Sequence, residues 1–266
     1  MKKVLLFIAM MVSMTSLAQK KLVLYFSESG STKAVAEELQ KQLGADIESI
    51  LPEVPYSGNF QETMQRNQRE TQSGTLPKIK PIKAKIADYD IIFLGYPIWG
   101  GTYASPIASL LKEQNFADKK VVPFCTFGSG GLNTSADALK KALPKANIQA
   151  GYGVRAARVV AAAKELDRFL KENGYKKGSV KPLPAYSEQK PVTDAEKAIF
   201  EAACSSYQFP LGTPETCGKR TTDDSIDYEF KVKSQGFGGG APSTSTIYVT
   251  VGKEAGAKPE FTEVVR

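Results

Sequence analysis

The sequence predicts an α/β protein whose larger domain is a doubly wound, five-stranded parallel sheet in the strand order 2-1-3-4-5. Between residues 21 and 173, short apolar runs alternate with segments whose apolar residues recur at helical spacing. Strands that alternate with helices in this way form a parallel sheet covered by helices on both faces. Three of the apolar runs end in loops rich in Ser, Thr or Gly, and ligands bind at the strand ends of such sheets.

The five strands are predicted from apolar runs that contain β-branched and aromatic residues. They are expected at Leu22–Phe26, Ile47–Leu51, Ile91–Tyr96, Val121–Phe127 and Ile148–Val154. The intervening segments place apolar residues three or four positions apart, which is typical of amphipathic helices. Helices are therefore expected at Thr32–Leu43, from near Pro106 through Ile107–Leu111, at Leu132–Leu143 and at Val159–Glu172.

Residues 52–83 interrupt this alternation. Prolines and glycines break the segment repeatedly, and a polar helical stretch runs from Gln61 to Glu70. A loop of this length inside a compact domain usually carries function. We therefore expect the insertion to have a functional role.

The rest of the chain is predicted to form a linker and a second domain. Residues 176–192 contain several prolines, which is typical of a linker, and they separate a domain of residues 19–175 from one of residues 193–266. Thr193 is placed to cap a helix over Asp194–Cys204. The later segments predict a small α+β domain, with strands and a turn at Ser225–Ser234, Gly236–Gly240, Thr246–Val251 and Phe261–Val265.

Residues 1–18 are predicted to be a signal peptide. Lys2 and Lys3 form a positive n-region, Val4–Met14 is almost wholly apolar, and Ser16-Leu17-Ala18 is a small-x-small cleavage site. The apolar run is too short for a stable membrane anchor. Gln19 is therefore the expected mature N-terminus, and the mature protein is expected in the periplasm or, alternatively, secreted beyond the cell.

The composition narrows the chemistry that this chain can perform. The sequence contains no histidine, which excludes His-based acid–base catalysis, Ser-His-Asp and Cys-His nucleophiles, and His-ligated metal sites. Its three cysteines are too few for a four-thiolate site, so no metal site is predicted. Catalysis in this protein is therefore expected to come from a cofactor.

Export permits disulfides. Cys204 and Cys217 lie in a stretch rich in Gly, Pro and Thr, and we expect them to form a disulfide, the alternative being two free thiols. In the chain-entropy model such a bridge contributes about 3 kcal/mol. Cys125 lies within an apolar strand pattern and is expected to be a buried core residue.

The formal net charge is +7, and the basic excess lies in residues 19–185, which hold 24 Lys and Arg against 16 Asp and Glu. A basic surface attracts nucleic acid, anionic lipid or an acidic protein partner. The chain has no Lys/Arg cluster interleaved with aromatic residues, so nucleic acid is not an expected partner. Arg155 and Arg158 follow the fifth strand and are expected to be solvated charges, with an anion site as the alternative.

The loop Ser27–Thr32 follows the first strand and opens the first helix. It contains three serines, one threonine and one glycine. Its hydroxyls, together with the free N–H groups and positive dipole end of the helix, suit a phosphate group. The loop lacks both the Walker sequence and the three spaced glycines of a dinucleotide fingerprint. A simple helix cap is the alternative, but a cap needs only one such residue.

Two further loops follow the third and fourth strands. The loop Tyr96–Tyr103 contains the single tryptophan, Trp99, which either stacks on a flat ring such as isoalloxazine or packs on the core as a plug. The loop Thr126–Gly131 contains three glycines whose N–H groups can bind the polar edge of a flavin, or else form a flexible turn. Three such loops on one sheet favour a single shared ligand.

On these loops the sequence resembles the flavodoxin family, in particular its bacterial branch with a Pro-x-Trp loop, over residues 21–173. The resemblance implies a flavodoxin-like fold with FMN as cofactor, and it implies that the Tyr56–Lys83 insertion lies over the cofactor site. It places the FMN phosphate at Ser27, Ser29, Gly30, Ser31 and Thr32. It places the isoalloxazine at Pro97, Ile98, Trp99, Gly100, Tyr103, Phe127, Gly128, Ser129, Gly130 and Gly131.

The chain also departs from this family. Many relatives carry a second aromatic residue where this sequence has Gly100, and Tyr103 is the expected substitute. Flavodoxins that carry electrons are typically acidic, whereas this domain is basic. The segment after residue 186 has no counterpart in simple flavodoxins, so the resemblance assigns it no role.

Three functions follow as hypotheses. The first is an FMN-binding carrier that transfers electrons in the cell envelope to a redox partner protein. The second is an FMN-dependent reductase of quinones or other small-molecule acceptors. The third is a non-enzymatic envelope binding protein that has lost FMN, against which the four hydroxyls of the first loop argue. The sequence therefore predicts a redox protein and leaves open whether it is an electron carrier or an oxidoreductase enzyme.

Overall fold

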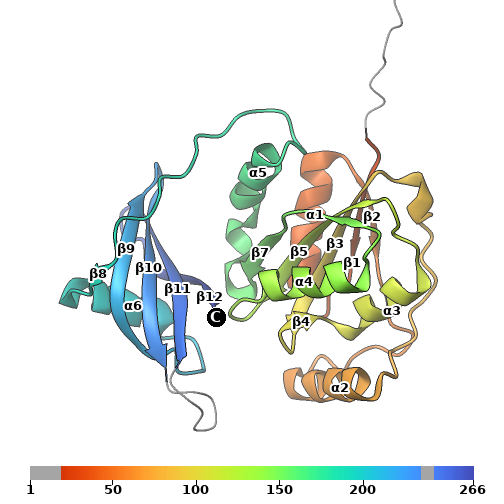
Figure 1. Cartoon of the computed structure of the whole chain (residues 1–266), viewed down its shortest axis with the longest axis horizontal. Coiled ribbons are helices and arrows are strands. Elements are labelled where there is room, and N and C mark those ends of the chain that lie inside the picture. Colours follow the sequence, from red (N-terminus) through yellow and green to blue (C-terminus); the bar gives the residue numbers. More distant parts are fainter. Residues whose placement is uncertain (1–18, 235–242) are drawn as a thin grey trace, which may run out of the picture.

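The computed structural model describes residues 19–234 and 243–266, which form two domains joined by a long connection (Figure 1). The predicted signal peptide and the predicted turn at Gly236–Gly240 lie outside the described residues. Within the described part of the chain, no helix is both long and apolar enough to cross a membrane.

The larger domain is built on a parallel sheet whose topology confirms the predicted doubly wound order. From one edge to the other, its strands are β2 (Asp46–Ser49), β1 (Lys21–Tyr25), β3 (Ile91–Trp99), β5 (Lys120–Phe127) and, one after the other along β5, β6 (Asn147–Ile148) and β7 (Tyr152–Arg155). This is the order 2-1-3-4-5, because β6 and β7 together take the place of the fifth strand.

The predicted fifth strand, Ile148–Val154, is thus two strands. Ile148 pairs with Val121 and Tyr152 pairs with Phe124. Between these two pairs the edge segment advances four residues while β5 advances three. The edge segment therefore contains one extra residue, a bulge that divides the predicted strand.

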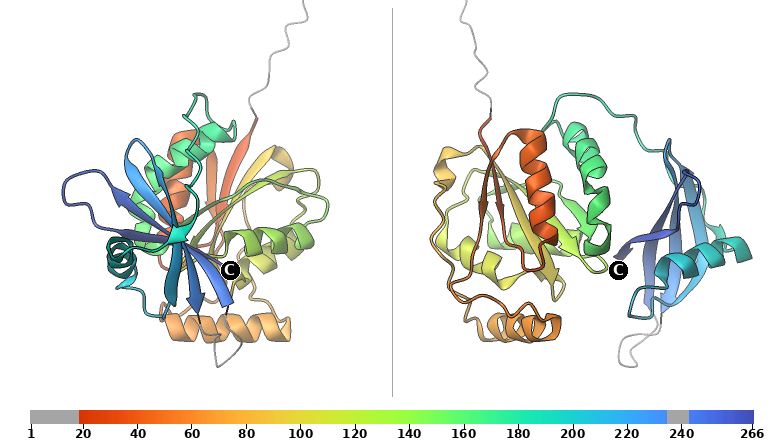
Figure 2. Two further views of the ribbon diagram at one scale, coloured as in Figure 1. Left: turned by 60° about the vertical axis from the view of Figure 1, so that its left-hand side comes forward. Right: turned by 180° about the vertical axis from the view of Figure 1, so that it is seen from behind.

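Helices cover both faces of this sheet, as predicted. Alternate strand residues point to opposite faces, so Val23 and Phe93 are buried on one side, and Leu24 and Tyr96 are buried on the other. The first face is covered by α1 (Ser31–Leu43) and α5 (Ala162–Glu172), which lie in front of the sheet in the right-hand view of Figure 2. The second is covered by α3 (Ser105–Glu113) and α4 (Leu132–Ala142).

Short 3₁₀ helices adjoin two of these elements. The predicted helix Val159–Glu172 begins with the 3₁₀ turns of η2 (Ala156–Ala161) before α5 continues it, and η1 (Ile86–Asp88) precedes β3. The polar stretch predicted at Gln61–Glu70 is the longer helix α2 (Phe60–Ser73), which lies below the sheet in Figure 1.

The smaller domain packs one helix on an antiparallel sheet, which confirms the predicted α+β class. The helix α6 (Asp194–Cys204) begins with a capping box between Thr193 and Glu196. It packs on Phe230 and Ile247 from the sheet. The strand order is β12 (Glu260–Val265), β11 (Ser243–Gly252), β10 (Ser225–Ser234), β9 (Thr213–Thr221) and β8 (Lys190–Pro191).

Two of these strands were absent from the predicted elements. β8 lies within the predicted linker, so the connection that carries no sheet pairing ends at residue 189. β9 contains Pro214, Gly218 and several threonines, and its apolar alternation is weak. Pairing with β10 forms this strand, because its own sequence has little strand pattern.

The structure does not show the expected Cys204–Cys217 disulfide, because both residues have free thiols in it. Cys204 ends α6, whereas Cys217 lies in the middle of β9 and packs in the core between the sheet and the helix. Spacing along the chain does not fix the separation that a disulfide requires. Cys125 is fully buried, as expected.

The interface between the domains corrects a further expectation. Arg155, expected to be solvated, is only 9% exposed and donates a hydrogen bond from Nη1 to the Phe261 carbonyl oxygen of β12 (2.9 Å). Arg158 pairs through Nε with the Glu260 carboxylate at 2.8 Å. Both side chains therefore connect the end of β7 to the last strand of the smaller domain.

The buried thiols should resist alkylation. Burial raises the pKa of Cys204 and of Cys217 to about 12, so both are protonated at pH 8. Their thiolate fraction at pH 8 is then smaller than that of free cysteine by on the order of a thousandfold. Intact mass spectrometry after iodoacetamide treatment should show slow labelling of the native chain and three labels after unfolding. A chain lighter by the mass of two hydrogens before reduction would instead establish the disulfide.

Candidate functional site

The three predicted loops lie together at the carboxyl edge of the sheet. The strands β1, β3 and β5 are parallel neighbours, so their carboxyl ends meet at this edge. A hydrogen bond of 2.8 Å joins the hydroxyls of Thr32, the last residue of the first loop, and Thr126, near the end of β5. The ring of Phe26 lies 5.4 Å from that of Trp99 in the second loop. The structure therefore brings all three predicted segments to one place.

The first loop offers unused hydrogen-bonding groups. Gly30 caps α1 without a side-chain bond, and the first helical bond runs from the Ala34 N–H to its carbonyl oxygen. The earlier N–H groups of the helix, those of Ser31 and Thr32 among them, have no helical acceptor. The Ser27 hydroxyl is buried and has no partner within the described residues. Unpaired donors beside a helix N-terminus are suited to an anion.

The second loop is a tight hairpin at the end of β3. Pro97 and Ile98 come directly before Trp99, the last residue of that strand, which pairs with β4 (Thr102–Tyr103) across a turn at Gly100. Ile98 and Tyr103 are half-buried at this edge. The Thr102 hydroxyl is buried without a partner in the described chain, so this hairpin also holds an unused polar group.

Trp99 belongs to the second loop, and its ring packs against two other aromatic side chains. Its ring lies edge-on to Phe26 and to Tyr56, at 5.4 and 5.0 Å between centroids, and it is 7% exposed. This packing has the form of the plug that the sequence left as an alternative. The stacking of Trp99 on a flavin stays a prediction.

The third loop is rich in glycine and lies next to the second loop. Phe127 is buried at the end of β5, and Gly128, Ser129 and Gly130 lead into α4, which Gly131 caps with φ 118°. A Cβ atom at Gly131 would lie 2.9 Å from the Ile98 side chain. Glycine is therefore required there both for its dihedral and for the close approach of the two loops.

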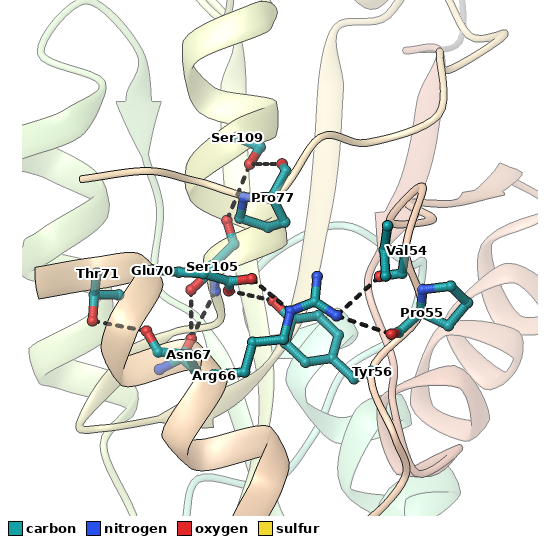
Figure 3. A network of polar contacts seen from close by, with 10 residues as sticks. All are labelled: Val54, Pro55, Tyr56, Arg66, Asn67, Glu70, Thr71, Pro77, Ser105 and Ser109. Atoms are coloured by element: carbon teal, nitrogen blue, oxygen red, sulfur yellow. Dashed lines mark hydrogen bonds and ion pairs between the residues drawn. The ribbon is translucent and has the colours of Figure 1, made fainter. Parts of the chain in front are cut away.

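The insertion contributes residues that the sequence did not single out (Figure 3). Arg66 lies over the Tyr56 ring at 4.0 Å and donates through Nε to Glu70 at 2.7 Å. Glu70 in turn accepts a hydrogen bond of 2.6 Å from the Tyr56 hydroxyl. Burial, together with that bond, raises the pKa of Tyr56 above its usual range, so the phenol stays protonated. This network holds Tyr56 against Trp99.

Three more hydrogen bonds anchor the insertion on the first loop and on Ser105, the first residue of α3. The Asn67 side-chain oxygen accepts from both the N–H and the hydroxyl of Ser105, at 3.1 and 2.7 Å. The Glu28 carboxylate of the first loop accepts from the Gly58 N–H at 3.1 Å. The insertion therefore lies against the first and second loops. Only its length and its polar helix indicated a role in the sequence, because the partners of each side chain depend on the tertiary fold.

Comparison with known proteins identifies the larger domain. The family described as flavodoxin matches residues 20–170. Among solved structures, a putative flavoprotein from Bacteroides eggerthii is 31% identical over 56% of this chain and 98% of its own, with a TM-score of 0.48. One from Bacteroides uniformis is 25% identical over 56% of this chain and 99% of its own, with a TM-score of 0.51.

A flavoprotein from Lactobacillus acidophilus, solved in complex with FMN, is 23% identical over 55% of this chain and 99% of its own, with a TM-score of 0.47. No curated protein matches the chain. The family match ends at residue 170, so the smaller domain lies outside it.

Removal of the Asn67 side chain should loosen the insertion. The Asn67→Ala substitution leaves the Ser105 N–H and hydroxyl, both buried, without their acceptor. We expect a loss of about 2 kcal/mol in the free energy of unfolding, measured by urea denaturation. Gln68→Ala, at an exposed position of the same helix, is the matched control and should change stability little. Equal stabilities of the two variants would show that the bond does not anchor α2.

Proposed function

The chain belongs to the flavodoxin family, with FMN as its cofactor, and we propose that it transfers electrons on FMN in the cell envelope. The observation that carries the proposal is the meeting of three loops at one sheet edge, where the buried hydroxyls of Ser27 and Thr102 have no partner within the described residues. Bound FMN supplies one- or two-electron chemistry, which suits a chain without histidine.

The first loop would hold the FMN phosphate. The hydroxyls of Ser27, Ser29 and Ser31 and the free N–H groups at the start of α1 are all donors, and the helix dipole favours negative charge there. Thr32 has a different part, because its buried hydroxyl bonds to Thr126 and fixes the helix start on the sheet.

The second and third loops would border the isoalloxazine. The half-buried side chains of Ile98 and Tyr103 offer apolar contact, and the backbone of Gly128–Gly131 offers N–H groups to the polar ring edge. Trp99 would hold the second loop in place through its contacts with Phe26 and Tyr56. The insertion would in turn restrict water at the site, since α2 is anchored to the same hairpin region through Ser105.

Transfer to a partner protein is favoured over reduction of a small substrate. The sequence contains no histidine, the side chain that most often relays protons to a substrate. Reduction of a quinone requires protons as well as electrons, whereas transfer between proteins requires only electrons. The basic excess of residues 19–185 suits an acidic redox partner.

The location in the envelope rests on residues 1–18, whose pattern is that of a cleaved signal. Intact mass spectrometry of the protein from the periplasmic fraction reports whether the chain begins at Gln19. Recovery of the protein with residues 1–18 in the cytoplasm would contradict export.

A phosphate-loop variant should separate binding of FMN from folding. Ser27→Ala removes a buried hydroxyl that has no partner within the described residues, so the cofactor-free chain should be as stable as the parent or more stable. Loss of a bond to a charged phosphate should weaken FMN binding by about 2 kcal/mol, or about thirtyfold in Kd. Riboflavin, which lacks the phosphate, is the control ligand. Equal losses for FMN and riboflavin in fluorescence titrations would place the phosphate elsewhere.

Steady-state kinetics should separate a carrier from a reductase. The FMN-loaded chain should oxidise NADPH no faster than free FMN at the same concentration, with a quinone as acceptor. Reduction by a chemical donor followed by stopped-flow mixing with an acidic redox protein should show electron transfer. Quinone-dependent NADPH turnover well above the free-FMN rate would instead establish a reductase.

A further inference from the structure

The smaller domain touches the larger one at the third loop. The Val264 N–H of β12 donates to the Ser129 carbonyl oxygen at 2.6 Å. Gly130 lies so close to β12 that a Cβ atom there would overlap the Val264 carbonyl oxygen. Figure 1 shows the end of β12 beside the segment that leads into α4. The third loop therefore lies between two walls, with Ile98 of the second loop on one side and β12 on the other.

Arg155 binds the two sides of this interface together. Its Nε donates to the Gly128 carbonyl oxygen at 2.7 Å, and its Nη1 donates to the Phe261 carbonyl oxygen at 2.9 Å. The guanidinium also lies over the Phe261 ring at 4.1 Å. One side chain thus fixes a residue of the third loop and a residue of β12 at the same time.

The environment of Arg155 makes this arrangement sensitive to docking of the smaller domain. Within the described residues, no carboxylate forms an ion pair with Arg155, although the side chain is buried. Burial lowers the pKa of the guanidinium, which means that its charge is poorly solvated. A buried cation needs its hydrogen-bond acceptors, so loss of the Phe261 carbonyl would destabilise the position of Arg155 and with it that of Gly128.

We propose that the smaller domain is the outer wall of the third FMN loop and that Arg155 is a positioning residue that couples its docking to FMN binding. This inference rests on the proposed function, because it requires that the third loop contacts FMN. The domain is then part of the cofactor site, even though none of its residues belongs to the family match. Coupling between two such events is reciprocal, so FMN should also strengthen docking of the domain.

Two substitutions in the full mature chain test the coupling from opposite sides. Arg155→Met keeps an apolar stem of similar length and removes both hydrogen bonds. Val264→Pro lies outside the FMN loops; it removes the N–H that reaches Ser129 and also changes a side chain in the core of the smaller domain. We expect the Kd for FMN to rise about tenfold in the first and about fivefold in the second. Arg155→Lys, which keeps the charge and can reach one carbonyl, should lie between the parent and Arg155→Met.

The controls keep structural damage apart from coupling. Val264→Thr keeps the branched side-chain shape and the N–H, although it adds a hydroxyl in the core of the smaller domain, and it should bind FMN nearly as the parent does. Arg220→Met breaks an ion pair with Asp227 inside the smaller domain and none of the hydrogen bonds that join β12 to the third loop, so it should also leave the Kd unchanged. If Arg155→Met does not fold, Val264→Pro against Val264→Thr still decides the question.

Hydrogen exchange distinguishes coupling through Arg155 from a purely structural role of this residue. In the parent chain, FMN should slow amide exchange in β12 by up to about tenfold, and this protection should disappear in Arg155→Met. A parent chain that binds FMN without protecting β12, or variants that bind FMN as tightly as the parent, would overturn the inference and leave FMN binding intact. A parent chain that does not bind FMN would overturn the proposed function itself.

Discussion

The parallel pairing of β1, β3 and β5 is the constraint on which the site depends. Parallel neighbours end at one edge, so the strand order itself brings together three loops that are far apart in the sequence. The bond between Thr32 and Thr126 then fixes the start of α1 against β5 in a fully buried setting. With the helix start held in this way, the free N–H groups of its first turn point at a defined place and can receive an anion.

Around this edge the chain adds two supports that a plain doubly wound sheet lacks. The insertion packs Tyr56 under Trp99 and ties α2 to Ser105, so it holds the second loop from one side. The smaller domain bonds to Ser129 and, through Arg155, to Gly128, so it holds the third loop from the other. Backbone-rich loops have little packing of their own, and such supports are what give them a fixed shape.

The sequence was sufficient for features that depend on local pattern. The strand order, the helix Asp194–Cys204 and the three loops follow from periodicity, capping and strand-end position. The sequence was insufficient for features that depend on tertiary contacts. Arg155 has the sequence context of a solvated charge, yet β12, more than 100 positions later, buries it. The cysteine spacing suggested a disulfide that the structure does not show. Spacing along the chain carries no information on the distance between Cys204 and Cys217 across the α6–β9 core.

The most direct test of the central claim uses the mature chain from Gln19. The protein is mixed with FMN, desalted, and examined by visible absorption and flavin fluorescence. We predict a retained yellow chromophore with quenched fluorescence, since the ring would lie against the second and third loops near Trp99. A colourless protein after desalting would contradict it, because three loops at one sheet edge would then have another role.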